Sequence, residues 1–168
     1  CPKERKVTGV RIAVFSDTHG DVDHMERAVR RERPDLVPHL GDLCRDFEEL
    51  QARMPLQTMQ NVCGNCDGFS LTPDQRVLQV EGRRLLMTHG HRYHVKASYN
   101  SAVFAAREAQ AELLLFGHTH IPFCEELEGL WVLNPGSCQG RRGTYGIIEL
   151  SGGGVTCCIK PAEEPETT

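Results

Sequence analysis

The chain has 168 residues, of which 39% are hydrophobic and 25% are charged, and its formal net charge is −4. This composition is that of an ordinary globular domain and excludes a largely disordered chain. The acidic balance argues against binding to a nucleic-acid polymer, which favours a basic face. No apolar run approaches the roughly 18 residues that cross a bilayer. We therefore expect a single domain over residues 1–168, without a nucleic-acid or membrane partner.

Eight cysteines are present, an even number that could indicate a disulfide framework. That arrangement suits short secreted chains that cannot build a core, and the first residues, CPKERK, lack the apolar segment of a signal peptide. We therefore expect reduced thiols and a cytoplasmic location. Cys63-Gly-Asn-Cys66 has the C-x-x-C spacing of zinc and redox sites, but the sequence contains no second C-x-x-C to complete a zinc site.

The first half of the chain alternates strands and helices. The apolar patterns predict strands over 10–15, 36–40 and 56–62, and amphipathic helices over 21–33 and 47–53. Pro38 suggests that the second of these strands is an edge strand or has only just begun there. This alternation is typical of parallel βαβ units.

The second half is dominated by strands. A hairpin with a Glu81-Gly82 turn is predicted over 77–87, an alanine-rich helix over 96–112 and a buried strand over 113–116. Four further strands are expected over 123–127, 130–133, 143–150 and 155–160. The acidic tail over 161–168 is expected to be frayed. Both halves fit an α/β sandwich of two packed mixed sheets with helices outside.

Side chains that bind metals recur where the predicted strands end. Because ligands of α/β folds bind beyond the carboxyl ends of strands, we expect these side chains to meet. Glycines beside them would let the backbone turn sharply and leave room for a substrate. The candidates are Asp17 and His19 in Ser-Asp-Thr-His-Gly, Asp42 in Gly-Asp, Asn65 in Gly-Asn-Cys-Asp, His89 and His91 in His-Gly-His, and His118 and His120 in Gly-His-Thr-His.

The mixture of carboxylates and imidazoles suits Mn, Zn, Fe, Co or Ni better than Mg or Ca, which prefer oxygen ligands alone. Seven ligands are too many for one ion with an open position. They suit two ions that share a carboxylate, as in two-metal phosphatases and nucleases. Each turn by itself is a weak signal, since a lone histidine is more often a surface or core residue. The ordered set of turns predicts a metal site.

These motifs, in this order, resemble the calcineurin-like metallophosphoesterase superfamily. The small size, the cysteine in Gly-Asn-Cys-Asp and the later Asn134-Pro135-Gly136-Ser137 are similar to its YfcE-type phosphodiesterase subfamily. The resemblance spans residues 12 to about 150. It implies a single metallophosphoesterase domain with a four-layer αββα sandwich, in which two mixed β-sheets are flanked by helices.

The resemblance also implies a role for each ligand. One metal ion would be bound by Asp17, His19 and His120, and the other by Asn65, His89 and His118, with Asp42 bridging the two. The expected cofactors are two divalent ions, with manganese first and Zn, Fe, Ni or Co as alternatives. A hydroxide bridging the ions would attack phosphorus in line, and the expected substrate is a small phosphoester, with phosphodiesters preferred.

The general acid is left open by the sequence. Cys66 stands where larger phosphatases of the superfamily carry a histidine, and a thiol is a poor acid for an alkoxide at neutral pH. His91, two residues from a ligand, is an alternative proton donor. Asn65 would assist as a neutral ligand that keeps its ion more electrophilic than a carboxylate would.

Two readings from other classes compete with the enzyme. The subfamily includes the retromer scaffold subunit, so the chain could be a protein-interaction scaffold that retains the metal site. It could also be a cysteine-based redox or zinc-storage protein. Every ligand position carries a competent ligand, which favours the enzyme. A homo-oligomer is left open.

Overall fold

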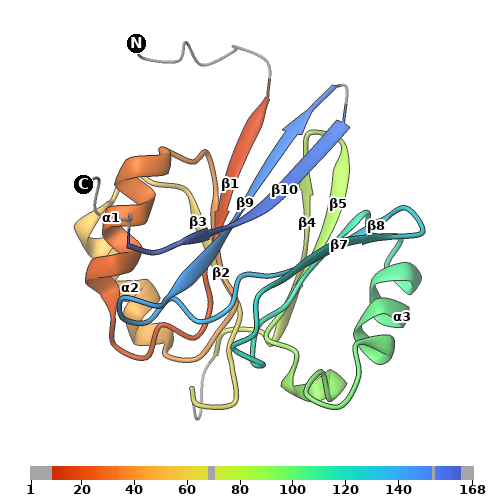
Figure 1. Cartoon of the computed structure of the whole chain (residues 1–168), viewed down its shortest axis with the longest axis horizontal. Coiled ribbons are helices and arrows are strands. Elements are labelled where there is room, and N and C mark those ends of the chain that lie inside the picture. Colours follow the sequence, from red (N-terminus) through yellow and green to blue (C-terminus); the bar gives the residue numbers. More distant parts are fainter. Residues whose placement is uncertain (1–8, 68–70, 153, 164–168) are drawn as a thin grey trace.

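Two mixed β-sheets pack face to face in the computed structural model, which describes residues 9–67, 71–152 and 154–163 (Figure 1). In the first sheet, β1 (Val10–Val14) pairs antiparallel with β9 (Thr144–Ser151), and β9 pairs with β10 (Gly154–Pro161). On its other side, β1 runs parallel to β2 (Val37–His39), which pairs parallel with β3 (Met59–Asn61). The order is therefore β10-β9-β1-β2-β3.

The contact between β1 and β2 is limited by Pro38, the second residue of β2. The N–H groups of Ala13 and Phe15 donate to the carbonyls of Leu36 and Pro38 at 3.1 and 3.0 Å. Proline has no N–H with which to return a bond, so isolated bridges connect the two strands. Of the two expected alternatives, the edge strand is wrong, because β2 has a neighbour on each side. The strand start is confirmed, because Pro38 is the second residue of β2.

The second sheet has the order β4-β5-β6-β8-β7. Its central strands β5 (Arg83–Thr88), β6 (Leu113–Leu115) and β8 (Leu130–Asn134) are parallel. The edge strands β4 (Gln75–Val80) and β7 (Phe123–Leu127) run antiparallel to their neighbours. The predicted hairpin is the β4–β5 pair.

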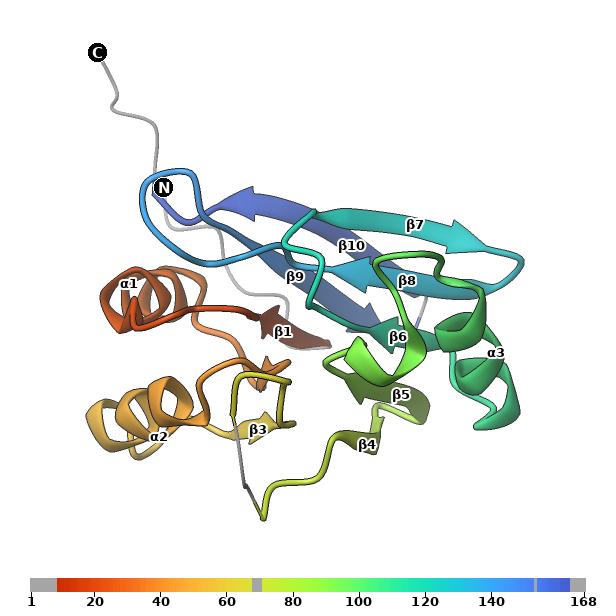
Figure 2. The ribbon, with the colours of Figure 1, turned by 90° about the horizontal axis from the view of Figure 1, so that it is seen from below.

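Helices cover the outer faces of both sheets (Figure 2). The helices α1 (Val22–Glu32) and α2 (Cys44–Arg53) lie on the first sheet, and α3 (Asn100–Glu108) lies on the second. The apolar residues of α1 that the sequence placed on one face are buried: Val22, Met25, Ala28 and Val29. The predicted four-layer αββα sandwich is confirmed.

The core between the sheets is made by apolar side chains of both. Ile12 and Val14 of β1 pack in one cluster with Leu85 of β5 and with Leu113 and Leu115 of β6, and all five are fully buried. This packing brings the carboxyl ends of β1 and β6 close together. A hydrogen bond joins the two ends, in which the backbone N–H of His118, beyond β6, donates to the side chain of Asp17, beyond β1.

Several element boundaries differ from those predicted. The helix α2 begins at Cys44 rather than at residue 47, and the helix predicted over 96–112 is the shorter α3, preceded by a 3-10 turn at His91–Tyr93. The strand predicted over 56–62 is reduced to β3, and Leu56 is fully exposed. At the other end, Ala162 is buried, so the frayed tail cannot begin at 161, and 164–168 lie outside the described residues.

Two expectations drawn from composition can be compared with the structure. Each cysteine in the described part of the chain is a free thiol. No helix within these residues has the length and apolar character needed to span a membrane.

The packing between the sheets predicts a large stability cost for Leu115→Ala. Leu115 is fully buried in this core, so its truncation should lower the free energy of unfolding by about 2–5 kcal/mol. Leu56→Ala is the matched control, since the same atoms are removed from an exposed site and the change should stay within about 0.5 kcal/mol. Urea unfolding followed by circular dichroism measures both, and equal losses would contradict this core assignment.

Candidate metal centre

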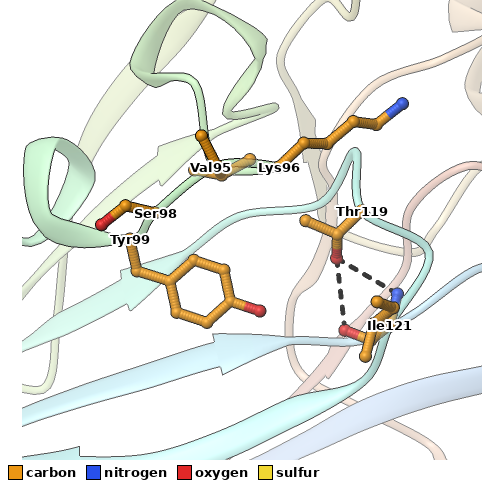
Figure 3. Close-up of a pocket in the computed structure, with 7 residues that line it drawn as sticks. Val95, Lys96, Ser98, Tyr99, Thr119 and Ile121 are labelled. Carbon is orange, nitrogen blue, oxygen red and sulfur yellow. Dashed lines mark hydrogen bonds between the residues drawn. The ribbon is translucent and has the colours of Figure 1, made fainter.

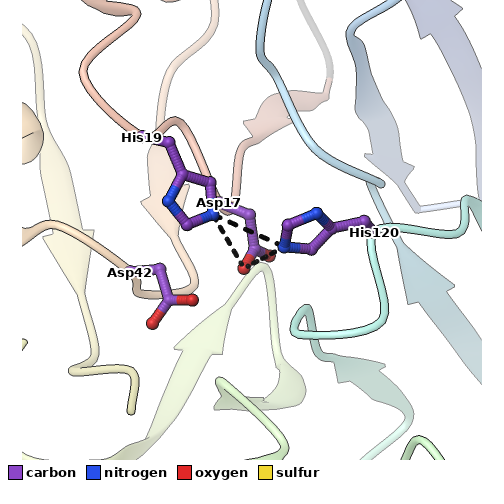
Figure 4. Close-up of side chains that lie close together, drawn as sticks. All are labelled: Asp17, His19, Asp42 and His120. Carbon is purple, nitrogen blue, oxygen red and sulfur yellow. Dashed lines mark hydrogen bonds and ion pairs between the residues drawn. The ribbon is translucent and has the colours of Figure 1, made fainter. Parts of the chain in front are cut away.

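All seven side chains predicted to bind metal lie together (Figure 4 shows four of them). Their donor atoms fall into two groups, each with its atoms within 4.8 Å of one another. One group consists of Asp17, His19, Asp42 and His120, and the other of Asp42, His89 and His118. Asp42 belongs to both. Asn65 joins the second group, because its Oδ1 lies 3.0 Å from Nε2 of His89.

In the first group, two imidazoles face one carboxylate. Nε2 of His120 lies 3.1 Å from Oδ1 of Asp17, and Nε2 of His19 lies 3.4 Å from Nε2 of His120. In the second group, Nε2 of His89 lies 3.1 Å from Nδ1 of His118 and 3.5 Å from Oδ1 of Asp42. Nitrogen and oxygen lone pairs thus converge in both groups.

The two carboxylates are almost completely buried. The side chains of Asp17 and Asp42 are 0% and 4% exposed, and within the described ranges their salt bridges are to histidines rather than to lysine or arginine. Burial opposes the ionisation of Asp42, but the N–H of Cys66 and the nearby His89 hold the pKa of this carboxyl below its usual value. Two neighbouring buried carboxylates without a fixed cation require positive charge from elsewhere.

The protonation of His89 also fits a bound cation. Its Nδ1 lies 2.7 Å from the carbonyl oxygen of Leu40, which only accepts, so the proton of the neutral ring is on Nδ1. Its Nε2 lone pair then faces the amide oxygen of Asn65 and Nδ1 of His118. Burial lowers the pKa of His118, which favours the neutral form that a metal ligand needs. The donor set therefore fits divalent metal ions.

The backbone at the ligands is unusual. Asp17, His19, Asp42, His118 and His120 all have positive φ, between 47° and 69°. Residues other than glycine rarely adopt this left-handed conformation, and such residues cluster at functional sites. The turns that carry the ligands must therefore be held in place by their surroundings.

Asp46 holds the turn that carries Asp17 and His19. It is buried in the first turn of α2, and its Oδ2 accepts from the hydroxyl of Thr18 at 2.6 Å and from the N–H of Gly20 at 2.7 Å. His39 supports the same hydroxyl. The N–H of Gly41 donates to its Nδ1, its Nε2 lies 3.1 Å from Thr18 Oγ1, and burial lowers its pKa to about 4, so the ring is neutral.

Asp67 holds the turn that carries Asp42. Its carboxylate accepts from the backbone N–H groups of Asp42 at 3.2 Å, Cys44 at 2.6 Å and Gly64. Asp67 is the last residue of the Gly-Asn-Cys-Asp motif that contains Asn65. The role of Asp46 was missed, and its only signal was an acidic residue on a helix beside a ligand turn.

The glycines beside the ligands are required by close contacts. A Cβ on Gly64 would lie 2.2 Å from Oδ1 of Asp42, and a Cβ on Gly117 would lie 2.0 Å from Oγ of Ser16 and 2.9 Å from Oδ2 of Asp17. These glycines are therefore needed because Asp42, Ser16 and Asp17 occupy the space that a Cβ would fill. That they also leave room for a substrate stays a prediction.

The turn over 134–137 supports the ligand turns from the second sheet. The Asn134 amide donates to the carbonyl of Gly117 at 3.1 Å and to the hydroxyl of Thr119 at 2.8 Å. The hydroxyl of Ser137 donates to the carbonyl of Asp17 at 2.7 Å. This segment therefore does more than reverse the chain.

Both candidates for the general acid lie at the centre. Burial and the neighbouring Asp42 raise the pKa of the Cys66 thiol, which is hydrogen-bonded to Asp42. The ring centroid of His91 lies 5.4 Å from that of His89 and 6.2 Å from that of His118. Its Nδ1 is buried and has no hydrogen-bond partner within the part of the chain that the structure describes. Burial also lowers its pKa.

Comparison with known proteins decides the family. Residues 10–153 match the calcineurin-like phosphoesterase superfamily domain. The chain belongs to this superfamily. It is 32% identical to the probable metallophosphoesterase YsnB of Bacillus subtilis over 154 residues, which are 88% of each chain. It is 30% identical to the phosphodiesterase YfcE of Escherichia coli over 100 residues, which are 52% of this chain and 50% of YfcE.

Solved structures agree with the fold. A predicted phosphoesterase from Streptococcus pneumoniae superposes with a TM-score of 0.79 and 26% identity, covering 94% of this chain and 92% of its own. Vacuolar Protein Sorting 29 from Cryptosporidium parvum superposes with a TM-score of 0.74 and 16% identity, covering 92% and 98%. At that identity the second likeness shows the fold alone.

The predicted family is therefore confirmed, together with the enzyme class, a metal-dependent phosphoesterase. The cluster of donor side chains is a site that could hold the divalent ions that such an enzyme requires.

The tight contact at Gly117 predicts that Gly117→Ala disrupts the site. The added methyl group would collide with Ser16 and Asp17, so the affinity for Mn²⁺ should fall at least about 10-fold in isothermal titration. Gly152→Ala is the matched control, because a Cβ there meets nothing within 4 Å. Unchanged Mn²⁺ affinity in Gly117→Ala would show that the close contact of Gly117 with Ser16 and Asp17 is not needed for metal binding.

Proposed function

We propose that the chain hydrolyses small phosphodiesters with two divalent metal ions. The observation that carries this proposal is the position of Asp42, whose carboxylate lies in both groups of donor atoms. One ion would be held by Asp42 with Asp17, His19 and His120, and the other by Asp42 with Asn65, His89 and His118.

When bound, two such ions would lower the pKa of a water shared between them and neutralise charge on the phosphoryl oxygens. The protein's own part is to keep the donors in place. The N–H of Cys66 donates to Asp42 at 2.9 Å and orients the shared carboxylate. Asn65 contributes an oxygen without a negative charge, which leaves more positive charge for the substrate.

For protonation of the leaving group, we propose His91. Its ring lies beside two of the proposed ligand rings. Because burial and His89 lower the pKa of this ring, it would have to take up a proton as the negatively charged substrate binds before it could donate one. Cys66 fits this role less well, because its thiol is already hydrogen-bonded to Asp42. We propose instead that Cys66 orients the shared carboxylate through both its N–H and its thiol.

Further details of the proposal rest on the donor set and on composition. Mixed nitrogen and oxygen donors suit manganese as well as Zn, Fe, Ni and Co, and we propose manganese as the metal. We also propose a single domain over residues 1–168 and a cytoplasmic location, the latter supported by the free cysteines. A homo-oligomer stays a prediction.

The alternative function is a protein-interaction scaffold with a retained metal site. The shared fold with Vacuolar Protein Sorting 29 favours it. The complete set of seven converging donors favours catalysis instead, because a scaffold has no need to keep them all. Metal analysis of the purified protein, combined with hydrolysis of bis(p-nitrophenyl) phosphate and p-nitrophenyl phosphate under each added metal, separates the two. A fully loaded protein that hydrolyses neither would favour the scaffold.

The position of Asp42 predicts that Asp42→Ala removes metal binding and activity together. The shared carboxylate would be lost, so Mn²⁺ content should fall below one ion per chain and kcat/KM for bis(p-nitrophenyl) phosphate should fall at least about 100-fold. Glu128→Gln is the control, since the side chain of Glu128 is 94% exposed. Retained turnover in Asp42→Ala would contradict the shared-carboxylate assignment.

The two candidates for the general acid can be separated by leaving groups. His91→Ala should slow hydrolysis of a phenyl ester more than that of a p-nitrophenyl ester, by about 10-fold or more, because only the poorer leaving group needs a proton. Cys66→Ser should keep bound metal and most activity on the activated ester. Complete loss of activity in Cys66→Ser, with normal folding by circular dichroism, would show that the thiol itself takes part in catalysis.

A further inference from the structure

A cavity of about 530 Å³ lies between residues 95–99 and the turn at Thr119 (Figure 3). Residues 95–99, which follow the 3-10 turn, form one wall, and Thr119 and Ile121 form the other. Thr119 stands between His118 and His120, two of the proposed ligands, so one turn contributes to both the cavity and the centre. A group held in this cavity would adjoin a phosphate held at the centre.

The walls offer an aromatic and an aliphatic surface. The ring of Tyr99 packs edge-on against Phe116 and Phe123, with centroids 4.8 and 5.1 Å apart, which holds it in place. Its hydroxyl points towards the turn at Thr119 and Ile121 (Figure 3). Ile121 is 63% exposed, so its side chain is available at the wall of the cavity. Covering such a surface with an apolar group is favourable.

The rim of the cavity is positively charged. Lys96 lines it and is exposed. In the described part of the chain, Lys96 has no salt bridge to a carboxylate. A phosphodiester carries one negative charge, which an ammonium group at this rim would attract.

We propose that this cavity binds a flat, apolar ester group, aryl or heteroaromatic, of a phosphodiester whose phosphate lies at the metal centre. The inference rests on the proposed function and specifies its substrate. A diester brings two ester groups, of which one leaves on the side opposite the attacking water. The other must be accommodated beside phosphorus, and Tyr99 and Ile121 form a surface for it there.

Two substrates with the same leaving group test the proposal: methyl p-nitrophenyl phosphate and phenyl p-nitrophenyl phosphate. Each kcat/KM is divided by the second-order rate constant for hydrolysis of the same diester by hydroxide without the protein. This division removes the difference in intrinsic reactivity between the two diesters. The corrected phenyl-to-methyl ratio should be about 10 or more for the wild-type protein. A corrected ratio near 1 would overturn the proposal.

Variants assign the preference to the cavity. Ile121→Ser, at an exposed position where folding is not at stake, should lower the corrected ratio at least about 3-fold, and Tyr99→Ala should lower it further. Lys96→Met should lower kcat/KM for both substrates and leave the corrected phenyl-to-methyl ratio unchanged. Phe104→Ala is the matched control, because Phe104 is another exposed apolar residue (66%) and lies outside the cavity. If the corrected phenyl-to-methyl ratio is unchanged in both Ile121→Ser and Tyr99→Ala, the preference for the phenyl ester does not come from this cavity.

Binding provides a readout that does not depend on turnover. Isothermal titration of the Mn²⁺-loaded protein should show diphenyl phosphate binding about 10-fold more tightly than dimethyl phosphate, and Ile121→Ser should reduce this difference. If no phosphoester is hydrolysed but this difference is found, the proposed function fails and the cavity assignment holds. If hydrolysis occurs but the variants change neither the corrected kcat/KM ratio nor the difference in binding between the two phosphates, the cavity assignment alone fails.

Discussion

The fold brings two buried carboxylates, those of Asp17 and Asp42, close together. When ionised they repel each other, and the hydrogen bonds of the surrounding turns hold them in place against this repulsion. Neither has a lysine or arginine partner among the described residues, and the rings nearest to them are histidines. Such a pair is costly in a low-dielectric interior unless positive charge lies between the carboxylates and hydrogen bonds fix them. The free energy that a bound cation would contribute is therefore also free energy of folding.

The turns around these carboxylates are held by further acidic residues. Asp46 accepts from the first ligand turn, and Asp67 accepts from the second. Backbone N–H groups supply most of these hydrogen bonds, so the negative charge of each anchor is stabilised without an ion pair to lysine or arginine among the described residues. This arrangement explains how ligand residues with positive φ can persist, since the hydrogen bonds offset the cost of that conformation.

The convergence of the candidate donor side chains could be predicted from the sequence because each follows an apolar strand, and strand ends in an α/β fold meet. The fold class followed from the same alternation. Residue-level packing could not be predicted in this way. Of the alanine-rich stretch over 96–112, only α3 forms a helix, while residues 95–99 before it form the cavity wall, held by the buried Val95 and by the packing of Tyr99 against Phe116 and Phe123. Pro38 indicated an edge, but β2 tolerates it between two strands because Pro38 still accepts a bond from Phe15.

The anchoring residues were the hardest to find. Nothing in the spacing around Asp46 marks it as a partner of Thr18, because their contact depends on how α2 docks against β1. The left-handed conformations were equally hidden, since histidine and aspartate adopt them only where the tertiary structure enforces them. Sequence patterns therefore identified which side chains converge, and the structure was needed to show what holds them there.

The short turn between His118 and His120 has a consequence for how this enzyme could diverge. Thr119 faces the cavity, while its hydroxyl is fastened by Asn134 and by the N–H of Ile121. Any change that reshapes this wall also shifts the two histidines on either side of it. New specificity should therefore arise more readily by exchanging residues 96–98 on the opposite wall, because these are exposed and do not flank a proposed metal ligand.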